Sequence, residues 1–165
     1  MSQKLSQVLA LLFLFSIYLT SCNEDPEYWE SDSRQELISI VSASFSDRAC
    51  QAYQIEGFYA EAKRDEDKKI HGYPIISGPL EMSPVDQKVL FSIIKNKSTY
   101  LDNAVPQDCF FQPGVAFQFN HQKRLVDLLV CFKCMELRYY LDGEIVWQTY
   151  FRDNGLEGLV RELFL

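Results

Sequence analysis

Alternation of apolar and polar residues in the last third of this 165-residue chain constrains its fold more than any other feature. Large apolar side chains occupy every second position of residues 115–119, and an apolar run covers residues 125–132 after a polar turn. Two further apolar segments, residues 137–141 and 145–151, flank Asp142-Gly143, a dipeptide that suits a tight hairpin turn. Because successive side chains of a strand point to opposite faces, the pattern predicts two antiparallel hairpins that share a buried face.

Three segments carry the start signals of helices. Ser33-Arg34-Gln35-Glu36 has the form of a capping box and begins a predicted amphipathic helix over residues 33–48. Ser83-Pro84 places a capping serine before a proline at the first helical position. Asn154 and Glu157 predict the cap of a C-terminal helix. Together with the hairpins, these signals predict an α+β fold, an antiparallel sheet of hairpins with about three packed helices.

The middle of the chain has weaker patterns. Residues 50–62 alternate loosely and are rich in aromatic side chains, which predicts a strand. The charged residues 63–69 are predicted as a turn, and residues 69–76 as a weak strand that Gly72 and Pro74 interrupt.

The first two dozen residues have the pattern of an export signal. Lys4 precedes an apolar run over residues 8–19, which as a helix spans about 18 Å and is too short for a bilayer core of about 30 Å. The run ends in Leu19-Thr20-Ser21-Cys22, which resembles the lipobox of bacterial lipoproteins. The resemblance implies cleavage before Cys22 and acylation of its sulfur, for example with palmitate. The alternative is an ordinary secretory signal followed by a chance cysteine.

The lipobox leads us to expect three parts: a signal peptide over residues 1–21, an acidic tether over residues 22–32, and one globular domain over residues 33–165. The lipid on Cys22 would anchor the mature chain in the cell envelope. In a Gram-negative cell this means the outer membrane, facing the periplasm or the cell surface. The acidic residues after Cys22 favour a solvated tether, although they also resemble the surface-export signals of Bacteroidota lipoproteins.

Composition narrows the classes of function. The net charge of −7 and the lack of a basic stripe argue against nucleic acid, whose phosphates would be repelled. The sequence contains no glycine-rich phosphate loop, and neither His71 nor His121 stands in a motif with a nucleophile. Both are predicted as surface histidines. The sequence therefore leans against an enzyme and against a cofactor, and leaves open a hydrolase whose polar residues converge only in three dimensions.

The four cysteines beyond Cys22 are the only recognisable constellation of reactive side chains: Cys50, Cys109, Cys131 and Cys134. An even number of cysteines in an exported chain indicates disulfides.

The register of the first hairpin selects one pairing. If Phe117 pairs with Leu128 and Asn120 with Leu125, the large apolar side chains of both strands share one face. Cys109 then lies diagonally beside Cys134, whereas Cys131 points to the opposite face. We predict a Cys109–Cys134 bridge, with Cys50 and Cys131 either paired with each other or left as buried thiols.

The CxxC spacing of Cys131 and Cys134 keeps two other kinds of site open. A zinc site could combine them with Cys109 and a fourth ligand, for which Cys50 fits better than His121 at the far end of the hairpin. A thiol-redox pair would need a turn, because in a continuing strand residues three apart face opposite sides at about 10 Å. No glycine or proline supplies such a turn.

The surroundings of these cysteines resemble a known pattern. Cys109-Phe110-Phe111-Gln112-Pro113, followed after a hairpin by Val130-Cys131-Phe132-Lys133-Cys134, resembles uncharacterised bacterial proteins and lipoproteins with a CFxP…CFxC pattern, from which the first motif departs by one additional residue before the proline. The resemblance implies that the cysteines act as a unit and assigns no activity. We expect a membrane-tethered binding or structural module with an envelope protein as partner. The alternative is a metal-binding or thiol-redox protein built on Cys109, Cys131, Cys134 and Cys50.

Overall fold

A computed structural model of the chain describes residues 32–46, 50–56, 65–101 and 108–164. The predicted signal peptide, the lipobox with Cys22 and nearly all of the predicted tether lie outside the described residues.

Every described element belongs to one compact unit, Asp32–Leu165. Within the described ranges, no helix is both long and apolar enough to cross a bilayer.

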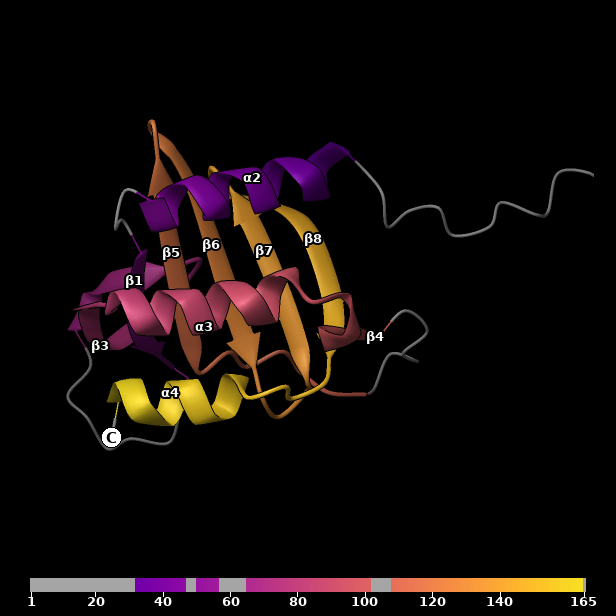
Figure 1. Cartoon of the computed structure of the whole chain (residues 1–165). Helices are drawn as coiled ribbons and strands as arrows, with labels where there is room; N and C mark the ends of the chain where they lie inside the picture. The colour runs from indigo at the N-terminus through magenta and orange to yellow at the C-terminus, as the bar shows by residue number, and fades with distance from the viewer. Residues whose placement is uncertain (1–31, 47–49, 57–64, 102–107, 165) are drawn as a thin grey trace, which may run out of the picture. The chain divides into compact units, whose positions relative to one another are not determined.

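The described strands form one eight-stranded antiparallel sheet in the order β2-β3-β1-β5-β6-β7-β8-β4, and the described α-helices all cover the same face (Figure 1). The predicted α+β fold with three helices is confirmed. The helices are α2 (Asp32–Ser46), α3 (Pro84–Lys95) and α4 (Leu156–Phe164), and a 3₁₀ turn, η2, covers Lys97–Thr99. The strands are β1 (Cys50–Ile55), β2 (Asp65–Ile70), β3 (Tyr73–Glu81), β4 (Tyr100–Leu101), β5 (Val115–His121), β6 (Arg124–Cys131), β7 (Glu136–Leu141) and β8 (Glu144–Phe151).

The two hairpins predicted from alternation are confirmed. In the β5–β6 pair, Phe117 lies opposite Leu128 and Asn120 opposite Leu125, which is the predicted register. The hairpin closes through two residues in the left-handed region, as a twisted two-residue turn requires. The β7–β8 turn uses Asp142-Gly143, again with positive φ at both positions.

The three predicted helices are present, and their caps differ from the prediction in two places. α2 begins at Asp32, so Ser33 lies within its first turn rather than before it. The side chain of Ser83 accepts a hydrogen bond from the backbone N–H of Asp86 and so caps α3. At α4, however, the carboxylate of Asp153 accepts from the backbone N–H of Glu157, whereas Asn154 donates to Thr99. The prediction of an Asn154 cap is therefore wrong by one residue.

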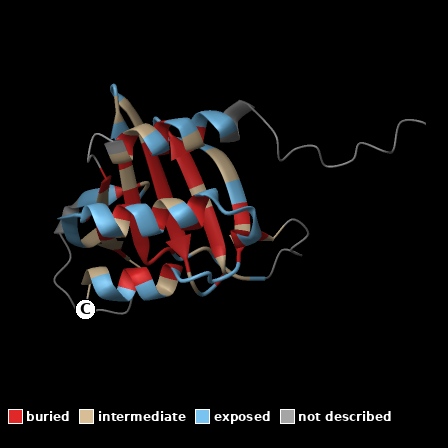
Figure 2. Ribbon diagram, viewed as in Figure 1, coloured by how far each residue is buried: buried red, intermediate tan, exposed pale blue. Residues whose placement is uncertain are grey.

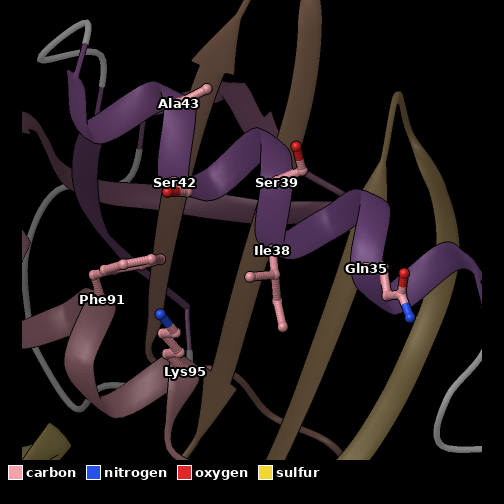
Figure 3. Close-up of a pocket in the computed structure, with 7 residues that line it drawn as sticks. All are labelled: Gln35, Ile38, Ser39, Ser42, Ala43, Phe91 and Lys95. Carbon is pink, nitrogen blue, oxygen red and sulfur yellow. The ribbon is translucent and has the colours of Figure 1, made fainter.

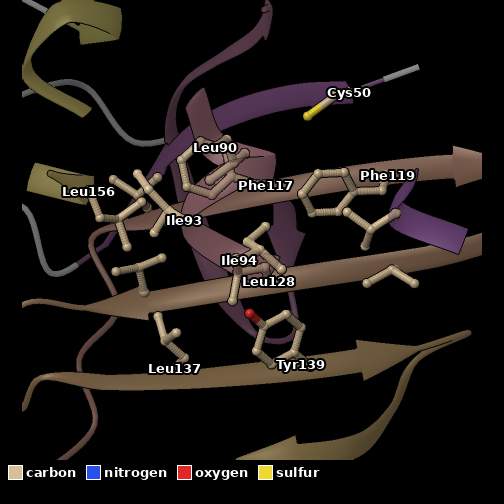
Figure 4. Packing of buried hydrophobic residues seen from close by; sticks show 14 of the residues in the cluster. Cys50, Leu90, Ile93, Ile94, Phe117, Phe119, Leu128, Leu137, Tyr139 and Leu156 are labelled. Carbon is tan, nitrogen blue, oxygen red and sulfur yellow. The ribbon is translucent and has the colours of Figure 1, made fainter. Parts of the chain in front are cut away.

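The main core lies between the helices and the sheet (Figures 2 and 4). Alternate residues of the central strands, such as Phe117, Leu128 and Tyr139, point into it, and Leu90 of α3 and Leu156 of α4 meet them from the helices. We call this side of the sheet the helix face. A smaller buried cluster lies on the opposite side, which we call the hairpin face: Tyr53, Ile55, Ile70, Ala116, Leu129 and Tyr140.

The β2–β3 hairpin corrects the prediction for residues 63–76. The charged residues from Asp65 onward belong to β2 rather than to a turn, and the chain reverses at His71-Gly72, where both residues have positive φ. The hairpin packs on the hairpin face, because Ile70 and Ile75 join the cluster there. Gly72, predicted to interrupt a strand, instead forms the turn that joins two strands.

Candidate functional site

The predicted Cys109–Cys134 bridge is present, with Cα atoms 5.8 Å apart. Cys134 belongs to the four-residue connection between β6 and β7, and Cys109 to the segment that leads into β5. Because β5 begins only at Val115, the two cysteines are not neighbours in the ladder. The bridge therefore joins two irregular segments at the same end of the hairpin. Cys134 is buried, whereas Cys109 is half-buried and is followed by the exposed Phe110.

A turn brings Cys131 next to this bridge, contrary to prediction. We expected Cys131 and Cys134 to face opposite sides of a continuing strand, because no glycine or proline is available to turn the chain. Met135 supplies the turn instead, with a φ of 51°, and its N–H donates to the carbonyl of Phe132. The backbone N–H of Cys134 consequently donates to Sγ of Cys131 at 3.4 Å.

The remaining thiols do not pair with each other. Cys50 and Cys131 are both free and buried, which is the second of the two predicted outcomes. Cys50 belongs to the core on the helix face (Figure 4), whereas Cys131 occupies the opposite-facing position of β6 next to Val130. The thiol of Cys50 donates to the sulfur of Met82 at 3.3 Å, and burial raises its pKa to about 12.

The residues that the structure describes do not form the zinc site that the sequence left open. No group of three or more histidine, cysteine, aspartate or glutamate side chains among them is placed to hold a metal ion. Two of the four expected thiolates are joined in the bridge, and Cys50 lies on the other face of the sheet. His121 ends β5 at the opposite end of the hairpin from Cys131, as expected.

A partly buried polar pair on the hairpin face was not predicted. Nε2 of His71 lies 2.7 Å from Oδ2 of Asp127 on β6, and the His71 ring stacks on Tyr140 with centroids 3.6 Å apart. The prediction of a surface histidine is therefore wrong for His71, whose side chain is 14% exposed. The other carboxylate oxygen, Oδ1, is the one buried side-chain N or O atom among the described residues without a hydrogen-bond partner.

The pair holds the tip of the β2–β3 hairpin against the centre of the sheet. The signal for it in the sequence is one charged residue, Asp127, inside the apolar run of β6. A buried carboxylate needs a partner, but the sequence does not say which one. The hydrogen bond of the pair and the stacking of His71 on Tyr140 support a structural link between hairpin and sheet.

A second polar pair lies beside it on β7. Nε of Arg138 donates to Glu136 at 2.7 Å, and the guanidinium lies 3.8 Å from the ring centroid of Phe111. Phe111 comes from the segment that carries Cys109, so this stacking fixes that segment above the sheet. Burial raises the pKa values of Tyr73 and Tyr140 on this face, which keeps both phenols neutral.

A groove lined by residues of α2 and α3 lies between these helices (Figure 3). It has a volume of about 490 Å³ and opens widely to solvent. Ile38 and Phe91 give it an apolar floor, while Lys95 brings the cationic group. Its other lining residues are Gln35, Ser39, Ser42 and Ala43.

Comparison with protein-family models, with curated proteins and with solved structures finds no match to this chain.

Proposed function

We propose that the chain is an exported lipoprotein, anchored through lipid on Cys22, whose α+β domain serves as a binding module of the cell envelope. The Cys109–Cys134 bridge carries this proposal, because disulfides form and persist in oxidising compartments outside the cytoplasm. The lipobox that ends at Cys22 supports it independently from the other end of the chain.

The groove between α2 and α3 offers a surface for a protein partner. It combines the apolar side chains of Ile38 and Phe91 with the hydroxyls of Ser39 and Ser42 and the charge of Lys95. An apolar centre with polar groups around it is typical of a protein interface. The net charge of −7 speaks against nucleic acid as the partner.

Metabolic labelling tests the anchor. The full chain, produced in a bacterium with lipoprotein-processing enzymes, should incorporate labelled palmitate and should begin at Cys22 after cleavage. The Cys22→Ser variant should lose the label and remain uncleaved, whereas Cys50→Ala, the control at a buried thiol, should keep it. Equal labelling of Cys22→Ser would contradict the anchor.

Site-specific photo-crosslinking in intact cells tests the binding module. A photoreactive amino acid at Ser39 or Ser42 should give one discrete adduct, which Ile38→Asp should abolish by placing a charge on the groove floor. The same probe at Gln148, exposed on the edge-proximal strand β8, is the matched control and should give none. Equal adducts at all three positions, or none, would contradict a binding role for the groove.

A further inference from the structure

The end of the β5–β6 hairpin brings three cysteines together, of which two form a bridge and one is a free thiol. Cys134 is bonded to Cys109, while its own backbone N–H donates to the sulfur of Cys131 at 3.4 Å. The free thiol is therefore held beside the buried half of the bridge. Cys50, the other free thiol, lies on the helix face and has no access to it.

We propose that this cluster is a thiol–disulfide exchange site in which Cys134 alternates between Cys109 and Cys131. The thiolate of Cys131 attacks Sγ of Cys134, a Cys131–Cys134 bond forms, and the Cys109–Cys134 bond breaks. Cys109 leaves as a thiolate and takes up the proton that Cys131 has lost. One disulfide and one thiol are present before and after the step, so no oxidant or reductant is consumed.

The turn between β6 and β7 makes the new bond geometrically accessible. Sγ of Cys131 is 3.4 Å from the amide nitrogen of Cys134, and the Cα of Cys134 is about 1.5 Å farther along one covalent bond. With the reach of the Cys131 side chain, about 2.8 Å, the distance between the two Cα atoms is at most about 8 Å. The turn must therefore tighten by about 1 Å at most to reach the 4.4–6.8 Å that a disulfide needs. The N–H of Phe151 donates to the carbonyl of Met135 and fixes this turn to β8.

The two cysteines of the bridge differ in their exposure to solvent, and the exchange releases the more exposed one. Cys134 and Cys131 are buried, whereas Cys109 is half-buried and its neighbour Phe110 is 90% exposed. The sulfur that exchange releases is thus the one nearest to solvent. A free Cys109 thiol is the species that an external disulfide, in a small molecule or a partner protein, would meet.

Trapping with a maleimide tests the exchange in the purified, unreduced full chain. Maleimide should accumulate on Cys109 as a Cys131–Cys134 disulfide appears, both identified by mass spectrometry of non-reduced peptides. The rate should rise with pH because the thiolate is the attacking species. Cys131→Ser should lower the rate of Cys109 labelling about ten-fold or more, because it removes the internal nucleophile.

The controls separate exchange from unfolding. Cys50→Ala removes the other buried thiol and should label Cys109 at the rate of the unmodified chain. If Cys109 reacts equally fast in Cys131→Ser, or if maleimide appears on Cys131 itself, the proposal is overturned.

If the exchange equilibrium lies far toward the Cys109–Cys134 bridge, a second variant still tests the proposal. In Cys109→Ser, treatment with oxidised glutathione should yield a Cys131–Cys134 disulfide, because Cys131 displaces glutathione from Cys134. A stable mixed disulfide of glutathione on Cys134, with Cys131 still free, would contradict the exchange. Neither outcome depends on the lipid anchor or on the groove.

Discussion

At the scale of single residues, the hairpin face shows how one charged side chain is accommodated in a buried strand. Asp127 is 4% exposed in the middle of β6, and His71 provides its hydrogen-bond partner from a turn that lies 56 residues away in sequence. Stacking on Tyr140 holds the imidazole in place. The charge in the strand thus determines where the tip of the β2–β3 hairpin packs.

We expect His71→Ala to lower the free energy of unfolding by about 3 kcal/mol, because it leaves a buried carboxylate without its partner. Urea denaturation measures the change. Asp127→Asn should cost less, since its amide oxygen still accepts a hydrogen bond from Nε2 of His71. A loss of less than about 0.5 kcal/mol in His71→Ala, which is typical of surface positions, would show that the pair does not hold the β2–β3 hairpin on the sheet.

The contacts of Asp142 in the β7–β8 turn predict that the stability of the domain depends on pH. Its carboxylate accepts from the backbone N–H of Leu125 at 2.9 Å and from Nε of Arg124 at 2.6 Å, and these hydrogen bonds lower its pKa below 3.8. Arg124 also binds Glu36 of α2, so the group joins the β7–β8 turn to a helix.

Because the pKa of Asp142 is lower in the folded state, its contribution to stability is present above pH 3.8 and is lost as the pH falls through the folded-state value. Asp142→Asn should therefore lower the Tm at pH 7, and the difference from the unmodified chain should shrink as the pH falls below 3.8. Carbon-detected NMR titration should place the midpoint of the Asp142 carboxylate below its ordinary value. A midpoint above 4 would contradict the assignment.

At the scale of elements, two glycines differ in whether their position has room for a side chain. Gly78 in β3 has a φ of 115°, and an added Cβ would lie 2.8 Å from the carbonyl oxygen of Ala52 on β1. The close approach of these two strands requires glycine at this position. Gly158 lies inside α4, where an added Cβ would have nothing within 4 Å.

Alanine at these two positions should have effects of opposite sign. Gly78→Ala should cost about 3 kcal/mol, because it combines a strained backbone with a clash against main-chain atoms. Gly158→Ala should stabilise the chain by about 0.5–1 kcal/mol, since alanine loses less conformational entropy in a helix. Thermal and urea unfolding of both variants measure this, and equal effects would contradict the packing described at Gly78.

At the scale of the whole domain, the Cys109–Cys134 bridge closes a loop between residues separated by 25 positions. That loop contains the complete β5–β6 hairpin, so the bridge limits how far the central strands separate when the domain unfolds. The segment before β5 is held in addition by stacking of Phe111 under Arg138.

Replacing both bridged cysteines by alanine should lower the free energy of unfolding by about 3 kcal/mol, as expected when a loop of this length is no longer constrained in the unfolded chain. Urea denaturation measures the loss. A reducing agent should lower the Tm of the unmodified chain and leave that of the double variant unchanged. A reductant-dependent shift in the double variant would show that another group carries the effect.

Local patterns predicted much of the sheet and one part of the candidate site. The alternation around Phe117 and Leu128 fixed a register, and that register led to the Cys109–Cys134 bridge. The helix starts at Ser83 and near Glu157 followed from capping residues. What the pattern missed is the two-residue strand β4 and the β2–β3 hairpin, whose charged strand and His71-Gly72 turn lack an alternating signal.

The sequence by itself determined which faces of the central strands are buried, where α3 begins and which two cysteines form the bridge, because these follow from local patterns and from the register of one hairpin. Tertiary structure alone decided that His71 meets Asp127 and that Cys131 lies beside the bridge. The first contact depends on folding a distant hairpin onto the sheet. The second depends on Met135 adopting a left-handed conformation, which is unfavourable for a residue with a side chain and which the hydrogen bond from the N–H of Phe151 to its carbonyl stabilises.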